Sequence, residues 1–270
     1  MSKKIVFATA GLLLSLHTGT VFAAGELGKG TRAFESQNYS AALDELQPLA
    51  KEGNPDALNM VGQMYENGWG ITKDEDKARQ YYDQGAAQGH LASVNSLRKL
   101  KNRDYLAELK TIEPQAMDGS ASAQNRLGEM YEFGQGVSRN ANSAFKWYKS
   151  AAEKGLVAAQ HNLARSYNFG TGVTQDFKTA ERWYLKAAEQ GHTQAMFFLG
   201  TMYSNSHGSD HSKDTNVIAY AWLHNAALLG NDTASAIERR LKMKLSSSEQ
   251  KAADQLASEL EARYVTPYKK

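Results

Sequence analysis

The side chains with the clearest chemical potential lie between residues 204 and 214. His207, Asp210, His211 and Asp214 place two imidazoles and two carboxylates within eight residues, and zinc accepts both ligand types. The segment contains no apolar residue that would hold such ligands in a fixed geometry. These residue types therefore favour a solvated loop, with a metal site as the alternative.

The remaining histidines indicate structural roles. His90 and His192 each follow a glycine that is expected to end a helix, a position that favours capping or packing. His161 and His224 fall inside predicted helices, with no nucleophile motif near them. The chain contains no G-x-S-x-G elbow, no phosphate-binding loop and no zinc-protease helix. We therefore predict a protein that is not an enzyme, with no catalytic residues and no cofactor.

The elements that must position any site are internal repeats. Small residues and aromatics recur at a constant spacing of 36 residues in the middle of the chain. One set is Ala123, Gly128, Tyr131, Gly134, Gly136, Ala144, Trp147, Tyr148, Ala151, Ala152 and Gly155, and the next is Ala159, Ala164, Tyr167, Gly170, Gly172, Ala180, Trp183, Tyr184, Ala187, Ala188 and Gly191. The same pattern runs from Ala57 to Gly89, and a copy with a longer middle runs from Ala195 to Gly230. A fixed period of this size is typical of stacked repeats.

Each copy predicts two helices joined by a glycine turn. Small residues on each helix allow close packing, and glycines such as Gly170 and Gly172 allow the positive φ of a tight reversal. The large rings should fill the spaces between neighbouring pairs, and Phe133 and Phe169 beside the turns are expected to pack as well. Trp69 stands between two glycines, where an exposed indole could anchor a peptide.

Two intervals depart from the pattern. Gly89 and Gly119 are only 30 residues apart, although residues 39–65 match residues 105–131 at a spacing of 66. We interpret residues 91–118 as a degenerate helix pair, with a domain boundary near 101–104 as the alternative. The fourth copy carries its insertion at 204–214. A C-terminal cap is expected over 232–264, and the capping-box residues Ser246 and Glu249 begin its second helix.

At these positions the chain resembles the Sel1-like repeat family, which is related to tetratricopeptide repeats. The resemblance rests on A-x4-G-x2-Y-x2-G-x-G in the first helix and turn and on A-x2-W-Y-x2-A-A-x2-G in the second helix. It implies an all-α, right-handed α/α superhelical solenoid, and an adaptor role without catalysis. The expected units are a solenoid over 24–264, clear repeats at 55–90, 121–156, 157–192 and 193–231, and a tail at 265–270.

The N-terminus has the pattern of a secretory signal peptide over residues 1–23. Lys3 and Lys4 precede an apolar run from Ile5 to Leu16, and small residues stand before a cut ahead of Ala24. The run is too short for a membrane span, and an uncleaved anchor is the alternative. The chain has no cysteine, so it offers no site for lipid attachment or a disulfide. We expect a periplasmic protein, or else a secreted one, without stable membrane insertion after cleavage.

The mature chain would be electrically balanced. Cleavage removes two lysines, so Lys+Arg falls from 31 to 29 against 29 Asp+Glu. This balance does not favour nucleic acid as a partner. We expect a protein or peptide partner that contacts the first helix of each pair between the packing positions. The expected contact residues are Asn59, Gln63, Trp69, Gln124, Arg126, Glu129, Gln160, Asn162, Arg165, Gln194 and Phe197.

Three other functions stay open at this point. The resemblance also covers regulators that hold a sensor-kinase ectodomain in the envelope. An immunity-type protein that neutralises a toxin is the second alternative. A hydrolase or β-lactam-binding enzyme is the remote third, because the repeat relatives linked to β-lactam binding have paired cysteines that this chain lacks.

Overall fold

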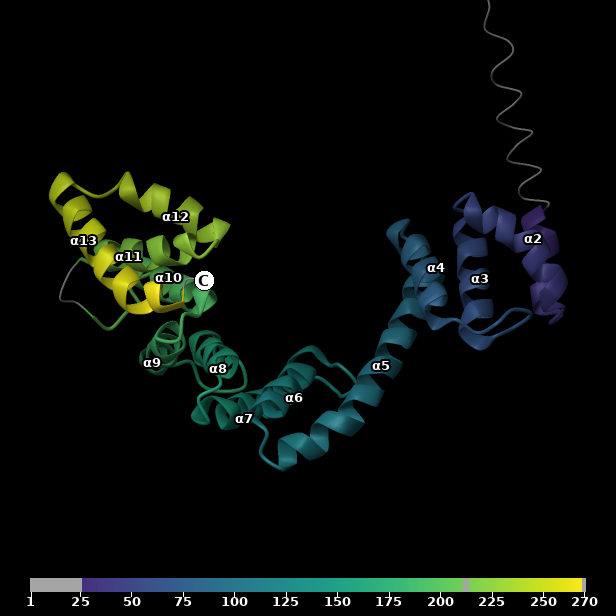
Figure 1. Ribbon diagram of the computed structural model, residues 1–270, viewed down its shortest axis with the longest axis horizontal. Helices are drawn as coiled ribbons and strands as arrows, with labels where there is room; N and C mark the ends of the chain where they lie inside the picture. The colour runs from purple at the N-terminus through teal and green to yellow at the C-terminus, as the bar shows by residue number, and fades with distance from the viewer. Residues whose placement is uncertain (1–25, 211–213, 269–270) are drawn as a thin grey trace, which may run out of the picture. The chain divides into compact units, whose positions relative to one another are not determined.

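A computed structural model describes residues 26–210 and 214–268, and these residues form helices and connecting loops without a strand (Figure 1). The predicted signal peptide lies outside the described residues. The helices are residues 26–35, α2 Tyr39–Lys51, α3 Pro55–Asn67, α4 Glu75–Ala87, α5 Leu91–Met117, α6 Ala121–Phe133, α7 Ala141–Glu153, α8 Val157–Phe169, α9 Phe177–Ala188, α10 Thr193–Ser204, α11 Thr215–Leu228, α12 Asp232–Lys242, α13 Ser247–Tyr264 and the 3-10 turn η1 Thr266–Tyr268.

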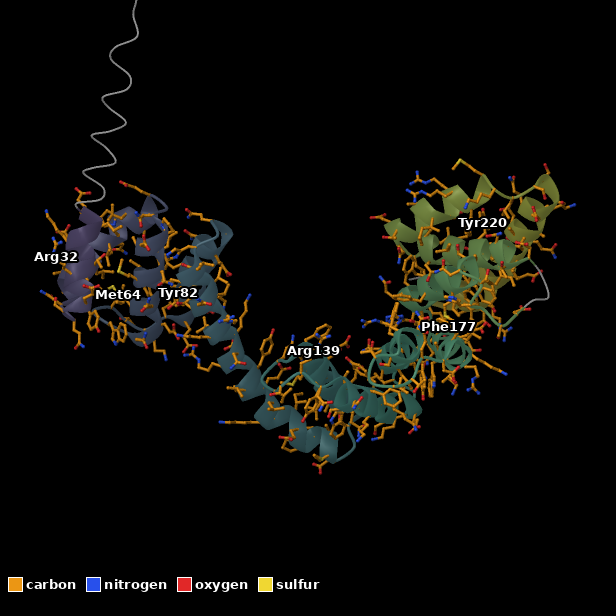
Figure 2. The ribbon with its side chains drawn as sticks, turned by 180° about the vertical axis from the view of Figure 1, so that it is seen from behind. Arg32, Met64, Tyr82, Arg139, Phe177 and Tyr220 are labelled. Atoms are coloured by element: carbon orange, nitrogen blue, oxygen red, sulfur yellow. The ribbon has the colours of Figure 1, made fainter. Side chains whose placement is uncertain are left out.

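The chain divides into two compact units, which we call unit 1, ending at Asp104, and unit 2, beginning at Tyr105. Unit 1 contains the α3/α4 hairpin, and unit 2 contains the hairpins α6/α7, α8/α9 and α10/α11. In unit 1, Met64 and Tyr82 are fully buried and are labelled in Figure 2. The all-helical solenoid expected from the repeats is confirmed, and the three hairpins of unit 2 stack through the contacts of α7 with α8 and of α9 with α10.

Local sequence explains where the helices begin and end. Asn54 caps α3 by accepting from the backbone N–H groups of Asp56 and Ala57, and Pro55 occupies the first turn, where no N–H is needed. The first helices α3, α6 and α8 each have 13 residues and end at a glycine in the left-handed region. At the other end of the chain, Ser246 and Glu249 form the expected capping box of α13.

The two helices of a hairpin meet where a small residue faces a tyrosine ring. A Cβ atom on Gly62 would lie 2.6 Å from Cε1 of Tyr82, and one on Gly128 would lie 2.6 Å from Cδ1 of Tyr148. Both tyrosines are buried. The small first-helix residue therefore lets the ring fill the hairpin interior.

Neighbouring hairpins meet at the second glycine of each turn. Cβ atoms on Gly70 and Gly136 would lie 2.9 Å from the carbonyl carbons of Tyr39 and Tyr105. A Cβ on Gly172 would overlap the carbonyl of Ala141. Each of these contacts joins a turn to a residue 31 positions upstream, which is the first residue of α2 or α7 or, for Gly136, a residue within α5. The glycine turns therefore fix the stacking as well as the chain reversal.

Residues 91–118 do not form the expected helix pair. They fold into one helix of 27 residues, α5, which crosses the division between the units. A complete hairpin joins its helices through seven residues, such as 68–74. Residues 39–65 and 105–131 are 66 residues apart, which is six fewer than two periods of 36. Almost all of the seven-residue turn is therefore missing between the two helices expected in 91–118, and they form one continuous helix. Leu100 is buried in unit 1, and Ala116 is buried in unit 2.

Gly155 and Gly172 allow two effects on stability to be measured separately. One is the strain of a side chain at positive φ, and the other is a clash with a neighbouring backbone. Gly155 has φ +88° with nothing near its Cβ position, whereas Gly172 has φ +74° and faces Ala141. We expect Gly155→Ala to lower the free energy of unfolding by about 1–2 kcal/mol through φ alone. Gly172→Ala should lower it by about 1–3 kcal/mol more through overpacking. Urea unfolding of both variants measures the difference, and equal losses would contradict the proposed backbone contact.

Candidate interaction surface

Successive first helices contact one another through a repeated pair of positions, 37 residues apart. The Nδ2 atom of Asn59 donates to Oγ of Ser96 at 3.1 Å, and Nδ2 of Asn162 donates to Oδ1 of Asn125 at 3.0 Å. At the next step, the ring of His161 lies 5.5 Å from that of Phe198. The contact therefore changes from polar to aromatic between α8 and α10.

Several residues expected to meet a partner are instead buried in the stack. Asn59, Gln124 and Gln160 are each only 5% exposed. Gln124 donates to the carbonyl of Ala116, and Gln160 accepts from Gln190. The expectation that these three side chains face solvent is wrong, because the neighbouring helices approach closely enough to use their polar atoms.

The other polar positions are tied to neighbours at the surface. Gln63 donates to Asn59, and Asn162 donates to Asn125. Arg126 holds Glu108 through two bonds of 2.7 Å and also reaches Glu129, while Arg165 donates to Glu132. Arg126 keeps the pKa of Glu108 below its usual range. Gln194 is exposed and Phe197 is half-buried against Phe198, and their role in binding stays a prediction.

The aromatic residues near the turns are arranged differently from the expectation. Trp69 stacks on Tyr39, with ring centroids 4.9 Å apart, and meets Phe34 edge-on, so it is part of the unit 1 core rather than a projecting anchor. Phe133 and Phe169, which were expected to pack, are 61% and 58% exposed. Each is the last residue of its helix, just before the glycine that reverses the chain, so its own hairpin leaves it largely uncovered.

A tyrosine, a glutamate and an arginine form a repeated polar cluster at two junctions between first helices. In unit 1, the hydroxyl of Tyr82 donates to Glu66, which also accepts from Arg103 at 3.3 Å. In unit 2, the hydroxyl of Tyr148 donates to Glu132, which also accepts from Arg165 at 3.2 Å.

Burial and the neighbouring carboxylate raise the pKa of both tyrosines well above the usual value. Glu66 and Glu132 thus satisfy buried hydroxyls, because each tyrosine ring reaches across its hairpin to the end of the first helix.

The third junction, between α8 and α10, lacks the charged pair. Asn168 and Thr201 stand one period after Glu132 and Arg165. The hydroxyl of Tyr184 is buried and has no hydrogen-bond partner among the described residues, although Asn168 lies close to it. A pocket of about 260 Å³ is present here, whereas the equivalent pocket at the Glu132–Arg165 junction measures about 20 Å³.

The larger pocket, which we call the α8–α10 pocket, lies near the C-terminal ends of these two helices. Its lining residues are Asn168, Phe169, Gln175, Phe177, Phe198, Thr201, Met202, Asn205 and His207. Phe177, at the start of α9, is labelled in Figure 2. Sequence reasoning missed this site, and a comparison of Glu132 with Asn168 and of Arg165 with Thr201 would have indicated it.

The described part of the insertion forms one wall of the pocket. The ring of His207 stacks on Phe177 at 3.9 Å, and the backbone N–H of Ser209 donates to Glu181 at 2.9 Å. Glu181 also accepts from the hydroxyl of Tyr203. Residues 205–207, 209 and 210 are exposed, as the composition favours for a solvated loop, but His207 and Ser209 also hold the described part of the insertion against α9.

The described candidate metal ligands serve other roles. His211 lies outside the described residues. His207 stacks on a ring, and Asp214 caps α11 by accepting from the backbone N–H of Asn216 at 2.8 Å. Along 26–210 and 214–268, no three His, Cys, Asp or Glu side chains come together as metal ligands would.

Two histidines lie between α8 and α10. Nδ1 of His192 accepts from the backbone N–H of Ala195 and so caps α10. The ring of His161 stacks on that of His192 at 4.7 Å, and its Nδ1 has no partner in the described part of the chain. Burial, helped by the nearby charges of His192 and Arg165, lowers the pKa of His161 to about 3, and burial also lowers that of His192.

The stacked hairpins and their repeated contacts define an α-helical repeat protein. The Sel1 repeat matches residues 55–90, 121–156, 157–192 and 193–231, together more than half of the chain. The chain therefore belongs to the Sel1 repeat family, whose members are commonly scaffolds for protein interaction. None of the helices described is long and apolar enough to cross a membrane.

Individual relatives are more distant. An uncharacterised protein of Neisseria meningitidis serogroup B is 29% identical over 38% of this chain, which spans only 30% of that protein's length. A Sel1 repeat protein from Oxalobacter formigenes is 24% identical, with a TM-score of 0.47, over 86% of this chain and 96% of that one. A protective antigen with an SLR fold from uropathogenic Escherichia coli is 22% identical, with a TM-score of 0.45, over 91% and 62%.

The buried histidines make stability depend on pH. Below pH about 6.5 the unfolded chain binds protons on His161 that the folded chain does not, so stability falls as the pH falls towards the folded pKa of about 3. Each such group contributes a slope of at most about 1.4 kcal/mol per pH unit. Replacing His161 by Asn, the residue found at the equivalent positions 59 and 125, should reduce this slope. Urea unfolding at pH 7 and pH 4.5 measures it, and an unchanged slope would contradict the assignment.

Proposed function

We propose that the protein is an exported, non-enzymatic scaffold that binds another protein through unit 2. The observation that carries this proposal is the edge formed by the ends of α8 and α10. There, the exposed ring of Phe169 stands beside a pocket that is some ten times larger than its counterpart at the preceding junction. Exposed aromatic rings beside pockets are typical anchor points of protein interfaces.

The use of polar groups inside the stack supports a non-catalytic role. Tyr82, Tyr148 and Tyr203 have raised pKa values because they are buried and donate to carboxylates. Arg126 and Arg165 are engaged by glutamates in the same way. Shifted pKa values often accompany active sites, but each of these groups already has a structural partner.

The proposed export rests on the N-terminal sequence. Lys3 and Lys4 followed by the apolar run of residues 5–16 have the composition that the secretion machinery recognises. Electrical balance of the mature chain is compatible with a free protein in the periplasm. We place the protein there, with release from the cell as the second location.

Two exposed phenylalanines at equivalent positions provide a matched test of partner binding. Phe133 and Phe169 end successive first helices and are similarly exposed, but only Phe169 lines the α8–α10 pocket. With the mature chain as bait in an envelope extract, we expect Phe169→Ala to reduce capture of the specific partner about tenfold or more, the loss typical of an anchor residue. Phe133→Ala should leave capture nearly unchanged. Equal capture by wild type and Phe169→Ala would contradict the proposed surface.

Export has its own test. Full-length protein expressed in a bacterium with a periplasm should appear in the periplasmic fraction. Its intact mass should be that of a chain whose first residue is Ala24. Leu13→Arg interrupts the apolar run and should leave the precursor in the cytoplasm. Finding uncleaved wild-type protein in the cytoplasm would contradict export without affecting the proposed binding surface.

A further inference from the structure

The α8–α10 pocket is a changed version of a position that is closed one repeat earlier. The small pocket at the preceding junction is lined by Glu132, Asn162, Arg165, Ser166, Phe169 and Thr171. One period later these positions hold Asn168, Phe198, Thr201, Met202, Asn205 and His207, and all six line the larger pocket. Both charged residues have become neutral, and a ring and a thioether have replaced two small polar groups.

The exchange leaves the fold with an unsatisfied group. The Tyr184 hydroxyl has lost the glutamate that its counterparts Tyr82 and Tyr148 use, and it is fully buried. Asn168 beside it is itself only 8% exposed. An unpaired buried hydroxyl reduces stability, so gains in packing within the chain do not explain the loss of the glutamate. Asn168, which stands in its place, lines the pocket, so the exchange opens the pocket at a cost in stability.

We propose that this pocket binds one neutral aromatic side chain of the partner protein, an inference that rests on the function proposed above. None of the nine lining side chains is a carboxylate, an ammonium or a guanidinium. A charged ligand group would lose its hydration there without gaining a counter-charge. Phe169, Phe177, Phe198 and His207 offer ring faces and edges, and Met202 offers a thioether, which are the groups that pack well against an aromatic ring.

Size and rim chemistry favour a side chain on a polypeptide over a free small molecule. The volume of about 260 Å³ is below the range of about 300–1,000 Å³ of small-molecule sites, and it suits a single ring. The side chains of Gln175 and Asn205 belong to the lining and are exposed. Gln175 already donates through Nε2 to the carbonyl of Asn168 at 2.7 Å, so its amide oxygen and the amide of Asn205 are the groups able to pair with the backbone on either side of that ring. The exposed Phe169 extends the apolar contact beyond the pocket.

The test uses the mature chain with carbon-13 in its methionine methyl groups, because the Met202 methyl reports from the lining. The probe is N-acetyl-tyrosinamide, which carries a neutral ring between two backbone amides. We expect a saturable shift of the Met202 signal. Three comparison probes should each bind at least about fivefold more weakly. They are N-acetyl-leucinamide, which lacks a ring, the α-amide of N-acetyl-glutamate, which keeps its side-chain carboxylate, and p-cresol, which lacks the backbone amides. Equal binding of the anionic probe or of p-cresol would overturn the proposed ligand class.

A closure variant provides the decisive comparison. Asn168→Glu with Thr201→Arg rebuilds the charged pair of the preceding junction and gives the Tyr184 hydroxyl an acceptor, so stability should be kept or raised while probe binding falls at least tenfold. Phe198→Asn, which restores the residue at position 162, gives a second variant if the first fails to fold. Phe133→Ala should bind the probe as wild type does.

The two proposals fail in different ways. Unchanged probe binding in a folded closure variant, or no shift of Met202 in the wild type, would overturn the aromatic subsite. Partner capture that still depends on Phe169 would in that case leave the proposed function standing. Probe binding that the closure variant abolishes supports the subsite, even if Phe169→Ala leaves partner capture unchanged and so contradicts the binding surface proposed above.

Discussion

The close approach of a small first-helix residue to a second-helix ring is the contact on which the rest of the structure depends. Gly62 and Gly128 leave room for the rings of Tyr82 and Tyr148, and the ring in turn sets the register of the two helices. Because the ring is long, its hydroxyl reaches the end of the first helix and requires an acceptor there. Packing of the tyrosine ring against the small residue thus determines where its hydroxyl needs an acceptor, and Glu66 and Glu132 provide that acceptor.

The single helix α5 shows how the sequence differs where a hairpin lacks the turn between its two helices. Position 98 corresponds to Gly62 and position 101 to Tyr65, which would face the second helix of the same hairpin. With that helix absent, Arg98 and Lys101 stand there and are exposed. Leu97 and Leu100 remain apolar because they still pack within unit 1. The sequence of α5 is therefore adapted to a helix with one packed side in each unit.

Periodicity predicted the hairpins well because the residues that repeat are those that determine the packing. It could not predict the single helix α5, since residues 91–118 are rich in helix-forming residues, and such a composition fits one long helix as well as two shorter helices. It also misplaced Trp69 and Phe133, because a ring beside a glycine turn is covered only if another segment happens to lie there. Buried amides such as Gln124 look like surface residues in a sequence, and only the position of Ala116 shows that they are used inside.

The pocket between α8 and α10 depends on a general property of stacked repeats. Each junction contacts only its neighbours, so a change at one junction alters stability locally and leaves the others intact. The Glu132–Arg165 pair can therefore persist while Asn168 and Thr201 open the next junction, and the longer loop that brings His207 onto Phe177 builds a new wall without disturbing α9. In a repeat protein, the residues that differ between equivalent junctions are thus the ones to examine for binding, because the shared residues are already required by the stack.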